Sequence, residues 1–406
     1  MFNHHWSACL ALILGVANAA PSVVVTFDNL GARVRSQNPS LAAARLRIAE
    51  AYGRMRTAGR LENPRLETSV QHTPSFREGS IELGISQKFP VTNRLRLEKQ
   101  LSLAEIRAAE LEVRREEQKL IAEARAALVE ILAIRQRRGL LRKQADLTNQ
   151  LAANIDTAAR KGEGSLLDAG QARLEATQTS TESLELDARE AMSTGLIKPL
   201  LGIGHREGLV ISGTLADPRS IATATNPARR ADYQIALLET DATEQSIAIE
   251  KSKRREDWEA AAFVSGERME DAPDGLENEA MVGVRLSIPL PFWNNNEGNI
   301  SEATARHERK RGEAAAMAAN IRGEAAAAIA AMRGWIKLMD EIDRNLLPLA
   351  GKQAADTEAA WRNGQAEFQT VLKSRAQRLQ LEITRQNALR EFHLTRVRYL
   401  AAIGTP

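Results

Sequence analysis

The sequence predicts a mainly α-helical protein in which long, antiparallel coiled-coil helices alternate with a small β portion of four strands. Three observations predict this fold class. Aromatic residues make up only 4% of the 406 residues, while Ala, Leu, Arg and Glu dominate, as is typical of long helices. No proline occurs from Val91 to Lys198. Between the helical regions lie segments in which apolar and polar residues alternate, as they do in half-exposed strands.

The N-terminal segment predicts export. An apolar run from Ala8 to Val16 is followed by Ala17-Asn18-Ala19, which has the form of an Ala-x-Ala cleavage site. The run is too short to span a bilayer as a helix, so residues 1–20 are predicted to be a signal peptide. The only cysteine, Cys9, lies inside this segment, and the mature chain is therefore expected to lack disulfides and thiolate metal sites.

The first half of the chain predicts one long helix with two short partners. The long helix covers residues 91–161, and the short ones cover 27–62 and 165–198. At 1.5 Å per residue they are about 106, 54 and 51 Å long, so the two short helices match the long one when stacked end to end. The seam of the long helix contains apolar residues spaced 4, 3, 4 and 3 positions apart. They are Leu97, Leu101, Ala104, Ala108 and Leu111.

The second half of the chain repeats this pattern. Asn38-Pro39 corresponds to Asn226-Pro227, Pro90 to Pro289 and Gly162 to Gly364, at offsets of 188, 199 and 202 residues. The second copy has its long helix at 297–363, with a kink expected at Pro348, and short helices at 226–257 and 365–402. The drift in offset is assigned to a loop at residues 266–279. Residues 21–215 and 216–406 are therefore predicted to be two structural repeats of one intertwined domain.

Each repeat is predicted to contain two strands of about ten residues, the length that a tilted transmembrane strand needs. The clearer strands are 81–89 and 281–288, and the weaker ones are 65–73 and 257–265. Four strands cannot close a barrel, and open sheet edges are not tolerated in lipid, so a membrane location would require several chains to share one barrel. The apolar stripes expected to face lipid are Ile81, Leu83 and Ile85, and Val282, Val284, Leu286 and Ile288.

The most specific stretch is Ser-Ile-Pro-Leu-Pro-Phe-Trp-Asn-Asn-Asn-Glu-Gly-Asn-Ile at residues 287–300, with Gln-Lys-Phe-Pro-Val at 87–91 as its counterpart. These stretches contain Pro90, Pro289 and Pro291 at the expected strand–helix junctions. With the repeated helices and strands, they resemble the TolC-like outer membrane efflux protein family over essentially the whole mature chain. The stretch at 287–300 looks like the heavy-metal efflux branch, the CzcC-like and CusC-like proteins.

The resemblance implies a homotrimer in the outer membrane of a Gram-negative-type bacterium. In this family each chain contributes four strands to a twelve-stranded barrel, and the helices form a tunnel through the periplasm. The implied function is a passive exit duct, supplied by an inner-membrane pump of the resistance-nodulation-division type through a periplasmic adaptor protein. The branch implies heavy-metal cations as the cargo, but the residues themselves leave open a metal cation, a drug or another small molecule.

The family docks its adaptor at two helical hairpin tips. The residues carried over from the resemblance are Gly162, Gly164, Ser165 and Leu166 at the first tip, and Gly364 and Phe368 at the second. Acidic rings narrow the tunnel entrance in some members. Here Thr370 and Lys373 fall near those places, and only Asp168, on the first tip, is acidic, which is a departure from a cation-binding entrance.

Other function classes find little support. The net charge is only +3 and acids are interspersed with bases, which disfavours nucleic-acid binding. None of the six histidines pairs at metal-ligand spacing, and neither a phosphate-binding loop nor a nucleophile elbow is present, so no enzyme activity and no cofactor are expected. The alternative is a non-channel periplasmic coiled-coil scaffold or adaptor-like protein. A secreted enzyme is a third, weaker alternative.

Overall fold

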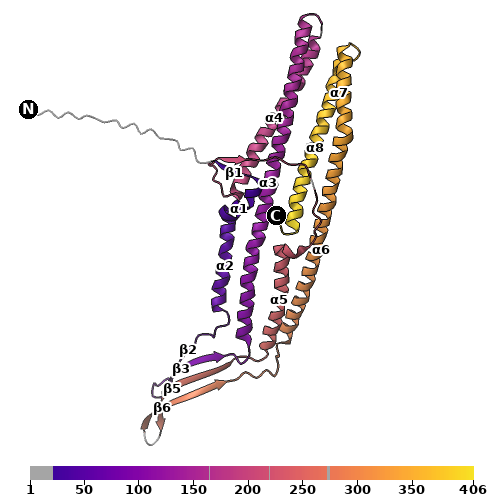
Figure 1. Ribbon diagram of the computed structural model, residues 1–406. Coiled ribbons are helices and arrows are strands. Elements are labelled where there is room, and N and C mark those ends of the chain that lie inside the picture. The colour runs from indigo at the N-terminus through magenta and orange to yellow at the C-terminus, as the bar shows by residue number, and fades with distance from the viewer. Residues whose placement is uncertain (1–21, 164, 219, 272–274) are drawn as a thin grey trace, which may run out of the picture. The chain divides into compact units, whose positions relative to one another are not determined.

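The computed structural model describes residues 22–163, 165–218, 220–271 and 275–406. The predicted signal peptide and Gly164 lie outside these residues. The helices (Figure 1) are α1 (Phe27–Gln37), α2 (Pro39–Thr57), α3 (Arg94–Arg160), α4 (Leu166–Leu200), α5 (Ala231–Ser252), α6 (Glu297–Glu341), α7 (Leu347–Arg362) and α8 (Phe368–Ala402). The strands are β1 (Val23–Val25), β2 (Arg65–His72), β3 (Gly79–Phe89), β4 (Leu209–Ile211), β5 (Trp258–Asp271) and β6 (Gly275–Ser287). The chain divides into two compact units, one containing residues up to Gln37 and Ala127–Leu215, the other Asn38–Ala126 and Ala216–Pro406.

The first unit combines α1, α4 and the C-terminal half of α3 with a parallel pair of short strands, β1 and β4. Sequence patterns did not reveal these strands, because three residues are too few for an alternation to be recognised. Arginines of α3 hold α4 through a ladder of ion pairs, in which Arg138 and Arg142 both contact Asp187. Arg135 contacts Glu190 at 2.6 Å.

The second unit contains the remaining helices. Helix α6 packs against both α5 and α8, and α7 packs against α8. The predicted long helix at 297–363 is interrupted by a π-helical turn at Ile342–Leu346, which ends two residues before Pro348, the proline at which we expected a kink. The predicted single helix at 27–62 is wrong. It is two helices, because Asn38 caps α2 by accepting a hydrogen bond from the Leu41 amide and Pro39 starts the new helix, which ends at Thr57.

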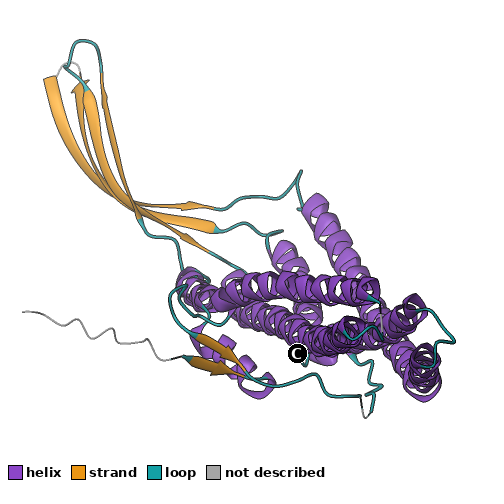
Figure 2. Cartoon of the chain, turned by 90° about the horizontal axis from the view of Figure 1, so that it is seen from above, coloured by secondary structure: helices purple, strands orange, loops and turns teal. Residues whose placement is uncertain are grey.

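The larger of the two sheets drawn in orange in Figure 2 is antiparallel. Its four strands lie in the order β2-β3-β5-β6. The prediction of a loop at residues 266–279 is wrong for most of these residues. Strands β5 and β6 continue through it as a ladder to the pair Asp271–Gly275. Polar residues on both sides of the hairpin had hidden its β character. The fold class is confirmed, since long helices dominate and the β portion is small.

Candidate functional site

The sheet has one apolar face whose side chains remain exposed. Residues directly opposite each other in neighbouring strands share a face, and the register places Val284 beside Ala262 and Ile85. Val282 and Val284 are 85% and 87% exposed. The predicted residues Ile81, Leu83 and Leu286 are exposed as well, and so is Ile288, one residue beyond the end of β6. The same register adds Leu66, Val70 and Val264, which the sequence analysis missed.

The opposite face of the sheet is polar and internally connected. The Ser86 hydroxyl donates to the Glu67 carboxylate at 2.6 Å. Arg285 pairs with Glu82 at 3.2 Å, and its guanidinium carbon lies 5.0 Å from the ring centroid of Phe263. The register places these five residues on the face that alternates with the apolar one. Both faces of the sheet thus have the character that the sequence predicted.

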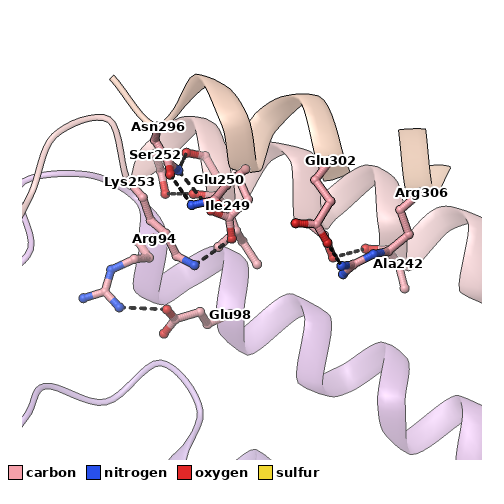
Figure 3. Close-up of polar contacts among 12 residues, drawn as sticks. Arg94, Glu98, Ala242, Ile249, Glu250, Ser252, Lys253, Asn296, Glu302 and Arg306 are labelled. Carbon is pink, nitrogen blue, oxygen red and sulfur yellow. Dashed lines mark hydrogen bonds and ion pairs between the residues drawn. The ribbon is translucent and has the colours of Figure 1, made fainter. Parts of the chain in front are cut away.

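The junctions between strands and helices are fixed by polar contacts (Figure 3). Asn296 has a left-handed backbone with φ of 59°, and its side-chain amide donates to the backbone carbonyl and the carboxylate of Glu250, at 2.8 and 3.0 Å. The hydrogen bond from Lys253 lowers the pKa of Glu250; burial opposes this shift and Asn296 adds to it. Asn296 therefore attaches the start of α6 to the end of α5.

A second polar contact fixes the start of α3. Arg94 contacts Glu98 at 2.9 Å and Asp257, next to β5, at 2.5 Å. Burial, the largest influence, lowers the pKa of Arg94, but the two carboxylates together outweigh it and raise the pKa. Of the predicted junction residues, Pro90 follows β3 directly, while Pro289 and Pro291 lie two and four residues after the end of β6. Because proline cannot donate to a ladder, these positions mark where pairing ends.

The two hairpin tips, α3–α4 and α7–α8, have the same turn geometry. Gly162 and Gly364 have φ of 81° and 70°, a conformation that favours glycine. In each turn the residue after the glycine donates its amide to a carbonyl five residues earlier, Glu163 to Ala158 at 2.9 Å and Gln365 to Ala360 at 2.8 Å. At the first tip the Ser165 hydroxyl caps α4 by accepting hydrogen bonds from the Leu167 and Asp168 amides.

Each tip also contains an acid held by two arginines, which we call the tip clamp. In the first clamp, Asp156 of α3 contacts Arg160 at 3.1 Å and Arg173 of α4 at 3.4 Å. The second clamp contains Glu358, Arg362 and Arg375, and each of them lies 202 positions after its counterpart. Glu358 contacts Arg362 at 2.5 Å and Arg375 at 2.6 Å. The sequence analysis missed both clamps, although their equal spacing from the turn glycines would have revealed them.

Of the two apolar residues predicted to be exposed at the tips, Phe368 is buried and Leu166 is exposed. Phe368 was expected to be an exposed contact for a partner, but it is only 3% exposed and its ring packs on Trp361, with centroids 5.2 Å apart. The aromatic neighbour in α7 shields it, and no sequence pattern had linked the two. Leu166 is exposed as predicted, and Leu167 beside it, which the sequence analysis did not single out, is exposed too.

The three predicted entrance residues lie in the first turns of the helices that follow the tips. Thr370 and Lys373 are exposed and Asp168 is partly exposed. Across the described ranges, no group of three or more His, Cys, Asp and Glu side chains is arranged to hold a metal ion. A search of the described helices finds none with the length and apolar character needed to cross a membrane.

Comparisons with known structures identify the fold. The chain is similar to VceC, an outer membrane protein from Vibrio cholerae, with 17% identity and a TM-score of 0.73 over 93% of this chain and 96% of that one. It is similar to CusC, studied for folding and transmembrane channel formation, with 15% identity and a TM-score of 0.74 over 94% and 92% of the two chains. The open state of the MtrE outer membrane channel from Neisseria gonorrhoeae matches with 13% identity and a TM-score of 0.70 over 93% and 88%.

No protein-family profile matches the sequence, and no curated protein matches it. At these identities the likeness shows the fold alone. The chain therefore has the fold of these outer-membrane channel proteins, with long helices and a small β portion.

Proposed function

We propose that the chain is a TolC-like outer-membrane exit duct, which passively conducts substrates delivered by an inner-membrane pump and a periplasmic adaptor. The observation that carries this proposal is the sheet with one exposed apolar face and one connected polar face. Soluble proteins rarely leave so much apolar surface uncovered, whereas a membrane strand places this face against lipid. The fold shared with outer-membrane channels supports the same function.

The sheet edges support a shared barrel. Strands β2 and β6 are each paired on one side only, so each leaves a row of backbone amides and carbonyls without partners in the sheet. In lipid these groups must be paired, and pairing β2 of one chain with β6 of the next closes the sheet. Three chains supply twelve strands, the assembly implied by the resemblance. The polar face would then line the lumen.

Charge placed on the apolar face tests the proposal. Val284→Lys puts a cation in the lipid-facing stripe, where the cost is about 2–4 kcal/mol near the bilayer centre. Met281→Lys is the matched control, because Met281 lies opposite Ser265 on the polar face of the same strand. We expect Val284→Lys to reduce the amount of protein in the outer-membrane fraction and Met281→Lys to leave it unchanged. Equal amounts for both variants, with a soluble monomer in the periplasm, would favour the scaffold alternative.

The remaining parts of the proposal concern processing and partners. Residues 1–20 would be a signal peptide, and the two repeats, 21–215 and 216–406, would supply equivalent helical tips. The adaptor would dock at these tips, where Leu166 offers an exposed apolar contact. A resistance-nodulation-division pump would supply the cargo. For the heavy-metal branch the test is a deletion strain, which should become sensitive to metal salts; unchanged sensitivity to metals with increased sensitivity to drugs would contradict it.

A further inference from the structure

A groove in the second unit lies where α5 begins and α8 ends, and it is also lined by α3 and α6. Its volume is about 760 Å³, a size typical of small-molecule sites. The groove is lined by six alanines and by seven charged side chains, together with Gln118 and Thr395. The small side chains are Ala122, Ala327, Ala328, Ala331, Ala401 and Ala402.

Helix α6 contains a run of alanines without charged residues, unlike the rest of that helix. Residues 325–331 read Ala-Ala-Ala-Ala-Ile-Ala-Ala, whereas charged residues occur on both sides of this run. Ala325 and Ile329 are buried in the core, while Ala327 and Ala331 are exposed and line the groove. Packing within the described chain does not require small residues at these exposed positions. Their effect is to leave an apolar hollow on the helix surface.

The groove is held open by Gln118 of α3. Its side-chain amide donates to the backbone carbonyls of Arg229, at 3.1 Å, and Gly404, at 3.0 Å. Its side-chain oxygen accepts from the Ala231 amide at 3.2 Å. One side chain therefore links the start of α5 and the end of α8 to α3. The walls of the groove are fixed before any molecule enters it.

Four cationic and three anionic side chains line the groove, so its charges are not balanced. Lys119 pairs with Glu123 at 4.0 Å. Arg230 is neutralised by Asp232 at 2.9 Å and Glu324 at 2.6 Å. Two further arginines, Arg115 and Arg398, are exposed beside the alanines. Neither forms an ion pair or a side-chain hydrogen bond with any residue in the part of the chain that the structure describes. The groove therefore combines an apolar floor with two free guanidinium groups.

We infer that this groove binds an amphipathic organic anion. The apolar body of the ligand lies on the alanines, and a carboxylate or sulfonate head group contacts Arg115 and Arg398. Planar guanidinium groups bind such oxyanions through paired N–H donors. An amphiphile with a cationic head lacks this complementarity and is repelled. The inference concerns helices only, so it does not depend on the location of the strands.

Photocrosslinking tests this inference on the purified full chain. One probe is dodecanoic acid with a diazirine in its chain, and the matched probe has the same chain with a trimethylammonium head. We expect the acid, and not the cation, to label peptides of α3, α6 and α8 around the groove. Excess unmodified dodecanoate should suppress the labelling. Equal labelling by both probes would overturn the inference, because it would show apolar partitioning without head-group recognition.

Four variants locate the site. Arg115→Gln and Arg398→Gln should each raise the Kd of the acid about threefold, as expected for exposed ion pairs, and so reduce labelling at half-saturating probe about twofold. The double variant should raise the Kd about tenfold and reduce labelling about fivefold. Ala328→Leu should reduce labelling by filling the floor. Arg333→Gln removes an exposed arginine of α6 outside the groove and should change nothing. Unchanged labelling in the double variant would overturn the inference. So would a groove that the acid does not label in the unmodified chain.

Discussion

The two tip clamps have the same residue spacing but differ in burial, which gives a quantitative prediction. Arg375 is 22% exposed and Arg173 is 58% exposed. The contact of Arg375 with Glu358 is 2.6 Å long, whereas the contact of Arg173 with Asp156 is 3.4 Å. Because a short, shielded ion pair is screened less by water, replacing Arg375 should cost more than replacing its counterpart.

We estimate the cost as about 1.4 kcal/mol for Arg375→Gln, as for a partly buried hydrogen bond to a charged group, and about 0.4 kcal/mol for Arg173→Gln, as for an exposed pair. The readout is amide hydrogen exchange in the two hairpins, because local opening of a tip leaves the rest of the fold intact. Exchange should become about tenfold faster around residues 350–380 in Arg375→Gln. It should become about twofold faster in the first hairpin in Arg173→Gln.

The second clamp should also depend on pH. Burial, the largest influence, raises the pKa of Glu358, but the contacts with Arg375 and Arg362 outweigh it and the pKa lies below its ordinary value of 4.5. A lowered folded-state pKa contributes stability above the ordinary value, and this stability is lost as the pH falls through the folded value. Acidification below about pH 4.5 should therefore weaken the second tip, and less so in Glu358→Gln. If Arg375→Gln and Arg173→Gln accelerate amide exchange in their hairpins equally, the reasoning from burial is refuted.

Three further predictions concern the sheet, a junction and the pH dependence of the helices. A Cβ added at Gly283 would lie 2.5 Å from the Phe263 ring, whereas one at Gly266 would meet nothing within 4 Å. Gly283→Ala should therefore lower the free energy of unfolding in urea by about 1–3 kcal/mol, and Gly266→Ala should change it little. Gly283→Ala should lose this effect when it is combined with Phe263→Ala. Asn296→Ala should cost about 2 kcal/mol in the same assay, because a left-handed alanine is strained and three side-chain hydrogen bonds are lost. A loss below about 0.5 kcal/mol would contradict the assigned role of Asn296. Burial, the largest influence, lowers the pKa of His393 from its ordinary value of 6.5. The free energy of unfolding should therefore fall as the pH drops below 6.5. A His393→Gln variant with the same pH profile would contradict this prediction.

Sequence reasoning recovered most of the fold because its signals are local and repeated. The seam from Leu97 to Leu111 predicted α3, and the alternation around Val284 predicted β6 and its exposed face. Turn glycines marked both tips, since Gly162 and Gly364 have the left-handed backbone that other residues avoid.

The errors arose where tertiary contacts decide the outcome. Phe368 is buried because Trp361 packs on it, and no periodic pattern connects the two residues. The β5–β6 hairpin continues into charged sequence because backbone pairing there does not need apolar side chains. The groove beside Gln118 depends on four helices meeting, which no local sequence pattern shows.

The central claim is that the exposed apolar face of the sheet lets several chains close a conducting barrel in a membrane. Recording from a planar lipid bilayer after adding the purified protein tests this claim most directly. The account predicts discrete, uniform conductance steps for the unmodified chain and for Met281→Lys, and none for Val284→Lys. A bilayer that stays non-conducting with the unmodified chain, together with a monomeric mass in solution, would contradict it.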